Sequence, residues 1–125
     1  MKFKDPSVEL EWNSEKLHKK CRLIVQAAEA WLWFHYKIEL LLTDVFRAHS
    51  TDSGIHEQWR AVDARTRDLP AGAAIRCSEF VNRNFPYDLS RPLIPSVLYH
   101  SVLKKSDGTV DPAGYHLHFQ VFGEV

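Results

Sequence analysis

The chain has 125 residues, 45% of them hydrophobic and 26% charged, which is the composition of an ordinary globular domain. Sixteen lysine and arginine residues balance sixteen aspartate and glutamate residues, so no net charge favours nucleic acid or an anionic membrane surface as a partner. No segment is long and apolar enough to cross a bilayer, and the N-terminal residues lack the apolar stretch of a secretion signal. We therefore expect one domain over residues 1–125, cytoplasmic as synthesised, with no nucleic-acid binding and no membrane insertion.

The first part of the chain predicts a long helix and then a strand. Over residues 13–34 apolar side chains recur at steps of three and four, which indicates one face of an amphipathic helix capped by Asn13 or Ser14. Residues 36–47 alternate between apolar and polar side chains, as a strand with one buried face does. The polar residues 49–54 predict a loop.

A second strand and a second helix are expected in the middle of the chain. Residues 60–66 are short and mixed, and we place a strand there because alternate residues, Asp63 among them, would share one face. Apolar residues at helical spacing predict a helix over residues 70–85, which Pro86 ends. Residues 86–95 contain three prolines and predict an irregular connection.

The remaining residues predict two more strands. Residues 96–104 alternate as a strand does, and turn signals follow at residues 107–108 and 111–114. Residues 115–122 show the clearest alternation in the chain. The predicted fold is α+β, with a small, mostly antiparallel sheet packed against two helices.

The last predicted strand aligns two histidines. His116 and His118 point to one side of the strand, while Leu117 and Phe119 point to the other, toward the core. Residues two apart on one strand face lie about 6.5 to 7 Å apart, so one imidazole can bind a metal ion while the other reaches a water molecule on it. Such a pair is typical of catalytic zinc sites.

His56 and Asp63 form a second polar group, with the histidine on a loop and the aspartate on the following predicted strand. Two histidines and one carboxylate can hold zinc and leave the fourth position open for water. Zinc lowers the pKa of that water to about 7 and polarises the carbonyl under attack. An amidase or a peptidase needs both effects.

These residues resemble the zinc peptidases of the D-alanyl-D-alanine carboxypeptidase type, which belong with the hedgehog and lysostaphin-type proteins in one superfamily. The pattern of that family, Ser-x-His-x-x-Gly-x-Ala-x-Asp followed far downstream by His-x-His, is matched by His56, Ala61, Asp63, His116 and His118. The resemblance implies that His56, Asp63 and His118 bind Zn²⁺ and that His116 assists catalysis. It also implies a fold like that of the hedgehog and DD-peptidase proteins and a bacterial cell-wall peptide, D-Ala-D-Ala or related, as the substrate.

Arg47 stands at the end of a predicted strand upstream of His56, where such peptidases often have an arginine. The resemblance implies that Arg47 binds a carboxylate of the substrate, and a planar guanidinium suits the C-terminus of a peptide. The small size of the chain is closest to the phage-encoded lytic members, so release to the cell wall by phage lysis is an expectation.

The sequence departs from the family pattern at two places that bear on activity. Trp59 occupies the position of the glycine, and no acidic residue stands three positions before His118. The general base is therefore open; His116 is our first expectation, with Asp111 or Glu57 as substitutes.

Two other functions stay open at this point. The missing acidic residue favours a non-catalytic zinc-binding or peptidoglycan-binding domain of the same superfamily. Two histidines and a carboxylate also hold iron in some oxygenases. In those sites a histidine and the carboxylate usually stand two positions apart, and His56 and Asp63 do not.

The other polar residues of note are expected to be structural. A lone histidine is usually a hydrogen-bonded or surface residue, which is our interpretation of His18, His35, His49 and His100. Arg60 and Arg65 are expected to pair with surface carboxylates. Cys21 and Cys77 have no neighbouring cysteine at metal-ligand spacing, so both are expected to be buried thiols.

Overall fold

The computed structural model describes residues 1–47, 56–100 and 115–123. Within them the chain forms three helices and five strands, which are β1 (Lys2–Phe3), α1 (Pro6–Trp12), α2 (Lys19–Tyr36), β2 (Leu41–Asp44), β3 (Ala61–Arg65), α3 (Ala73–Asn84), β4 (Val97–His100) and β5 (His116–Gln120). The strands make one sheet in the order β1-β2-β3-β5-β4, in which β1 is parallel to β2 and the other neighbours are antiparallel. The α+β class and the mostly antiparallel sheet are thus confirmed, with three helices in place of the two predicted.

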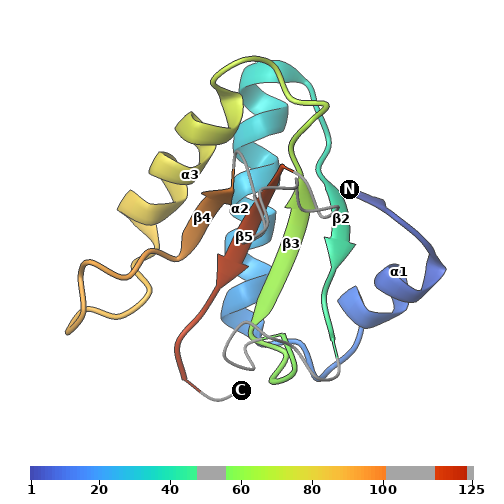
Figure 1. The fold of residues 1–125 in the computed structure, drawn as a ribbon, viewed down its shortest axis with the longest axis vertical. Helices are drawn as coiled ribbons and strands as arrows, with labels where there is room; N and C mark the ends of the chain where they lie inside the picture. Colours follow the sequence, from blue (N-terminus) through green and yellow to red (C-terminus); the bar gives the residue numbers. More distant parts are fainter. Residues whose placement is uncertain (48–55, 101–114, 124–125) are drawn as a thin grey trace, which may run out of the picture.

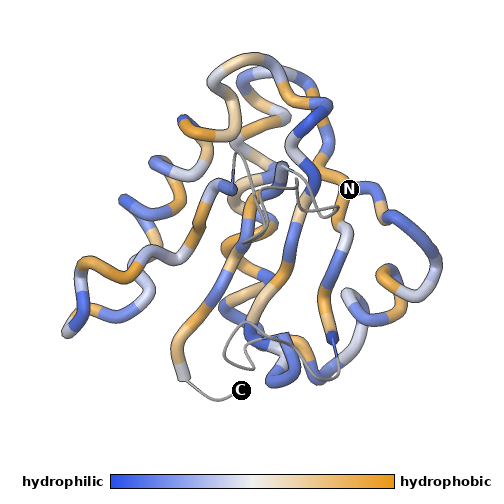
Figure 2. Tube along the Cα trace, viewed as in Figure 1, coloured by the Kyte–Doolittle hydropathy of each residue, from blue (hydrophilic) through white to orange (hydrophobic). Residues whose placement is uncertain are grey.

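Two helices pack on the sheet and the third lies at its edge. In Figure 1 helix α2 runs behind the sheet, α3 lies on the β4 side, and α1 lies beyond β2. Apolar and polar residues alternate along β5, as Figure 2 shows. Leu117 and Phe119 are fully buried and belong to the core that α2 and α3 help to form. The alternate residues of β5 therefore lie on the other face of the sheet, away from these helices.

Helix α2 confirms the predicted amphipathic pattern but begins later than residue 13. His18 is its N-cap, because the His18 Nδ1 accepts a hydrogen bond from the Lys20 backbone N–H at 3.1 Å. Its apolar residues are buried at the predicted spacing, namely Cys21, Ile24, Val25, Ala28 and Leu32. The expected cap at Asn13 or Ser14 is wrong, because Asn13 ends α1 and the cap of α2 is His18.

The sequence analysis did not predict α1 or β1. Helix α1 begins at Pro6 behind an Asp5 cap, whose carboxylate accepts from the Val8 N–H at 3.0 Å. Strand β1 is two residues long and pairs with β2. Both elements are too short to produce a periodic pattern.

The predicted strands are present, with shorter bounds. Strand β2 is confined to Leu41–Asp44 because α2 continues to Tyr36 and Lys37 then turns the chain with a φ of 58°. Strands β3 and β5 lie within their predicted ranges, and residues 86–95 form neither helix nor strand. Strand β4 confirms the first part of the range 96–104. The rest of that range, the predicted loop at 49–54 and the turns at 107–108 and 111–114 lie outside the described residues.

Pairing of the strands brings polar residues together on the face away from α2 and α3. Asp63 on β3 lies opposite His118 on β5, and His116 lies between Arg65 on β3 and His100 on β4. Side chains directly opposite one another in an antiparallel pair are close enough to interact. The sheet therefore joins residues that are far apart in the sequence.

Among residues 1–47, 56–100 and 115–123, no helix has the length and the apolar character that a bilayer span needs.

Candidate metal centre

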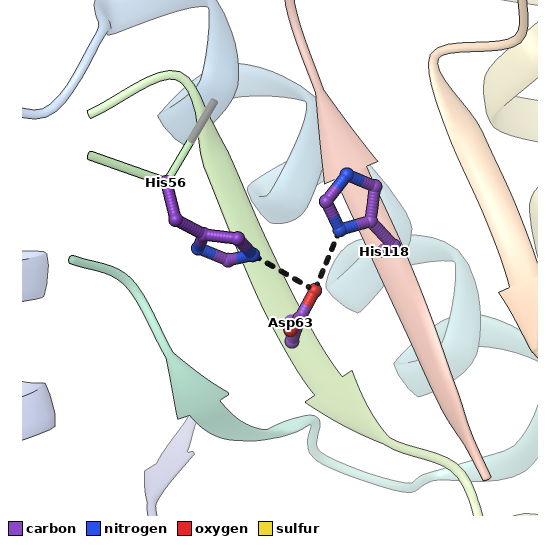
Figure 3. A group of neighbouring side chains, drawn as sticks. All are labelled: His56, Asp63 and His118. Carbon is purple, nitrogen blue, oxygen red and sulfur yellow. Dashed lines mark hydrogen bonds and ion pairs between the residues drawn. The ribbon is translucent and has the colours of Figure 1, made fainter. Parts of the chain in front are cut away.

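His56, Asp63 and His118, the three residues expected to bind metal, come together in the structure. One nitrogen or oxygen from each side chain lies within 4.8 Å of the other two. His56 is fully buried, and Asp63 and His118 are 5% and 7% exposed. Figure 3 shows both imidazoles converging on the carboxylate of Asp63. A metal ion could be held here by two nitrogens and one oxygen.

Asp63 Oδ1 is the atom that the two imidazoles share. His118 Nδ1 lies 2.8 Å from it and His56 Nε2 lies 3.3 Å from it (Figure 3). Burial alone would raise the pKa of Asp63, but hydrogen bonds from His118 and His56 outweigh it and hold that pKa well below its usual range. The carboxylate is therefore ionised and able to bind a cation.

The orientation of His56 is set by the end of β2. His56 Nδ1 lies 3.0 Å from the carbonyl oxygen of Val45, and a carbonyl only accepts, so Nδ1 carries the proton. In the neutral imidazole the lone pair is then on Nε2, the nitrogen that faces Asp63. A carbonyl partner behind the ring is the usual support of a metal-binding histidine. The donor set and its support therefore fit a metal such as zinc.

Burial and charge act in opposite directions on His56. Burial lowers the pKa of His56, but the hydrogen bond to Asp63 and the charge of that carboxylate more than compensate, so the pKa is raised. In the absence of metal, the neighbouring carboxylate therefore favours a proton on His56. A metal ion must displace that proton in order to bind.

A tight turn delivers His56 to the site. The Trp59 backbone N–H donates to the His56 carbonyl at 3.1 Å, and Trp59 has a φ of 60°. Glycine adopts this left-handed conformation freely, whereas another residue is strained there by about 1 to 2 kcal/mol. Trp59 therefore has a backbone conformation that glycine adopts more readily than tryptophan.

Arg47 lies at the same site. Its Nη2 is 3.6 Å from Asp63 Oδ2, and its side chain is 41% exposed. The guanidinium therefore reaches both the buried carboxylate and the surface. Its predicted role in binding a substrate carboxylate stays a prediction.

His116 and His100 form a pair beside the three converging residues. Their ring centroids are 4.8 Å apart, and the His100 ring is 6.3 Å from that of His118. Both are half-buried. Burial lowers the pKa of His100, and the neighbouring His116 and His118 lower it further.

His100 was expected to be incidental, but it lies beside His116 and His118. The alternation in this strand gave no clear signal, because the apolar Leu98 shares the face of His100. The register between β4 and β5, which sets His100 opposite His116, has no signature in the sequence.

Of the two residues considered as substitute bases, only Glu57 lies in the described part of the chain. Glu57 is exposed and is not part of the converging group, and Asp111 lies outside the described residues. Asp44 on β2, by contrast, is the register partner of Asp63 and is half-buried. Burial and the charge of Asp63 raise the pKa of Asp44. A second carboxylate that sequence analysis missed is therefore a neighbour of the site.

Searches against protein-family models, curated proteins and solved structures found no match to this chain. The function must therefore be argued from the site itself.

Proposed function

We propose that the protein is a zinc-dependent metallopeptidase that cleaves an amide bond in bacterial cell-wall peptides, D-Ala-D-Ala or related, on a fold like that of the hedgehog and DD-peptidase proteins. The observation that carries the proposal is the buried convergence of His56, Asp63 and His118 within 4.8 Å. Two imidazoles and one carboxylate are the protein ligands of known zinc peptidases. Their order along the chain also follows the family pattern that the sequence resembles.

The donor types favour zinc among the common metals. Calcium and magnesium prefer oxygen ligands, whereas two of the three donors here are imidazole nitrogens. When bound, zinc would supply a water molecule of lowered pKa and polarise the scissile carbonyl.

The residues around the three ligands have roles that a peptidase requires. In the proposal His116 accepts and returns a proton, since it is half-buried on the face of His118 and can be reached from solvent. His100 packs against His116 at 4.8 Å and orients its ring. Arg47 binds the substrate carboxylate with the exposed part of its guanidinium.

One observation favours a second candidate, a non-catalytic zinc-binding or peptidoglycan-binding domain. The residue three positions before His118 is Tyr115, so the acidic residue that some family branches use as a base is absent there. Such a domain would bind the metal ion and the cell-wall peptide but would not cleave the peptide.

A digestion assay with purified cell-wall peptides separates the two candidates. Zinc-loaded wild-type protein is expected to release products. His118→Ala is expected to lose both zinc and activity, whereas His116→Ala is expected to keep zinc but lose activity. His35→Ala is the matched control, because His35 is an exposed histidine on α2. Binding of the peptides without any turnover by the zinc-loaded wild type would favour the second candidate, and cleavage by protein without metal would refute both.

A further inference from the structure

We infer that Phe46 and Trp59 are positioning residues that hold His56 in place for metal binding. Their rings are stacked, with centroids 4.7 Å apart and planes inclined by 15°. Phe46 follows β2, and Trp59 precedes β3. This inference rests on the metal site of the proposed function and identifies what supports one of its ligands.

The stack is attached to His56 at both the side chain and the backbone. Phe46 is the next residue after Val45, whose carbonyl oxygen accepts from His56 Nδ1. Trp59 donates its backbone N–H to the carbonyl oxygen of His56. Each ring of the stack is therefore next to, or part of, a group that hydrogen-bonds His56. In the proposal, a shift of either ring would therefore move the imidazole relative to Asp63.

The left-handed backbone of Trp59 supports a positioning role for its side chain. Strained conformations such as a φ of 60° persist where the surrounding structure determines them, and they cluster at functional sites. Three contacts hold Trp59 in this case: the stack on Phe46, the His18 N–H that donates to the Trp59 carbonyl at 2.9 Å, and the Lys16 Nζ 5.8 Å from the ring centroid. A glycine would relieve the strain but would supply no ring. We therefore attribute the presence of a tryptophan at position 59 to its stack on Phe46 and not to the backbone conformation of the turn.

The location of the stack fits a supporting role and not a ligand role. Neither ring has an atom that binds zinc, and both residues are half-buried. Partners that orient a metal ligand from behind typically change metal affinity by about 10- to 100-fold when they are removed. That is the effect we expect from the loss of either ring.

Zinc affinity measured by calorimetric titration tests the inference with four variants. Trp59→Ala, Trp59→Gly and Phe46→Ala are each expected to weaken zinc binding by about 10- to 100-fold. Trp59→Phe keeps a stacking ring and is expected to stay within a few-fold of wild type. The double variant with alanine at both Phe46 and Trp59 is expected to bind zinc no more weakly than either single variant, because each single variant already removes the stack.

Trp33→Ala is the matched control. Trp33 is a 48% exposed tryptophan on α2 with the Lys37 Nζ 5.5 Å from its ring centroid, so it resembles Trp59 in its lysine contact but not in its location. Its removal is expected to leave zinc affinity unchanged. Thermal unfolding of each metal-free variant identifies any that fail to fold.

The NMR signals of the His56 ring in metal-free protein give a second readout that does not need zinc. They are expected to move in Trp59→Gly and to stay in place in Trp59→Phe and Trp33→Ala. Wild-type zinc affinity and unmoved His56 signals in Trp59→Gly would overturn the inference. Absence of zinc binding by the wild type would refute the proposed function instead, and the His56 signals would then decide the positioning role alone.

Discussion

Replacement of Asp63 by asparagine measures how the buried site is held together without metal. In the metal-free protein Asp63 Oδ1 contacts the imidazoles of His118 and His56 at 2.8 and 3.3 Å. Asparagine keeps the volume of the side chain but removes its charge, so protonated His56 would lose its buried counter-charge. We expect Asp63→Asn to lower the free energy of unfolding, and to lower it more at acidic than at alkaline pH.

The pH dependence follows from the directions of the two pKa shifts. The pKa of His56 is raised above 6.5, so its stabilising contribution is complete below 6.5 and is lost as the pH rises through the folded value. The pKa of Asp63 is lowered below 3.8, so its contribution is present above 3.8 and is lost as the pH falls through the folded value. Both contributions are therefore complete between pH 3.8 and 6.5.

The size of the effect follows from which groups are charged. Removal of one partner from a buried ion pair costs about 3 to 5 kcal/mol, which is the expectation near pH 5.5. Loss of a buried hydrogen bond between a carboxylate and a neutral imidazole costs about 1 to 3 kcal/mol, which is the expectation once the pH exceeds the raised pKa of His56.

Urea unfolding with a metal chelator, at about pH 5.5, 7 and 9, measures this difference. Asp68→Asn is the control, since Asp68 is an exposed aspartate beyond the end of β3. An equal loss of stability at all three pH values, or a more stable Asp63→Asn protein, would refute the assignment of a charged pair between His56 and Asp63.

The zinc affinity of the wild type is expected to fall on acidification, because the raised pKa of His56 lets protons compete more strongly with zinc for its nitrogen. Calorimetric titration between about pH 8 and pH 5.5 measures this affinity, and a constant value would contradict the expectation. Burial raises the pKa of Cys77 to about 12 and also raises that of Cys21, so Ellman's reagent should modify neither thiol until the protein unfolds. Fast reaction of the native protein would contradict this, because it would show that the thiols are accessible. Gly72→Ala should lower the free energy of unfolding by about 1 kcal/mol in urea titrations, because Gly72 has a φ of 78°, at which a residue with a Cβ is strained. Unchanged stability would contradict this.

Much of the fold could be predicted because long elements produce clear patterns. The apolar residues of α2 repeat over 18 residues, and the alternation in β5 assigns Leu117 and His118 to opposite faces. The same alternation placed His116 and His118 on one face, whereas the choice of His118 as a ligand came from the resemblance to the zinc peptidases. The two buried free thiols were also predicted from their isolation in the sequence.

Features that depend on tertiary contacts could not be predicted from these patterns. The N-terminal end of α2 is fixed by a hydrogen bond from Lys20 to the ring of His18, and histidine is an unusual cap. The nearness of Asp44 and His100 to the site comes from strand register. The ring of Trp59, whose backbone is left-handed, stacks on Phe46, and no local pattern in the sequence connects the two residues.

The zinc content of the purified protein tests the central claim most directly. We predict about one equivalent of tightly bound zinc in the wild type and in His35→Ala, and none in His56→Ala, Asp63→Ala or His118→Ala. A folded wild-type protein that binds no zinc, or alanine variants that keep a full equivalent, would contradict the assignment of His56, Asp63 and His118 as a zinc site.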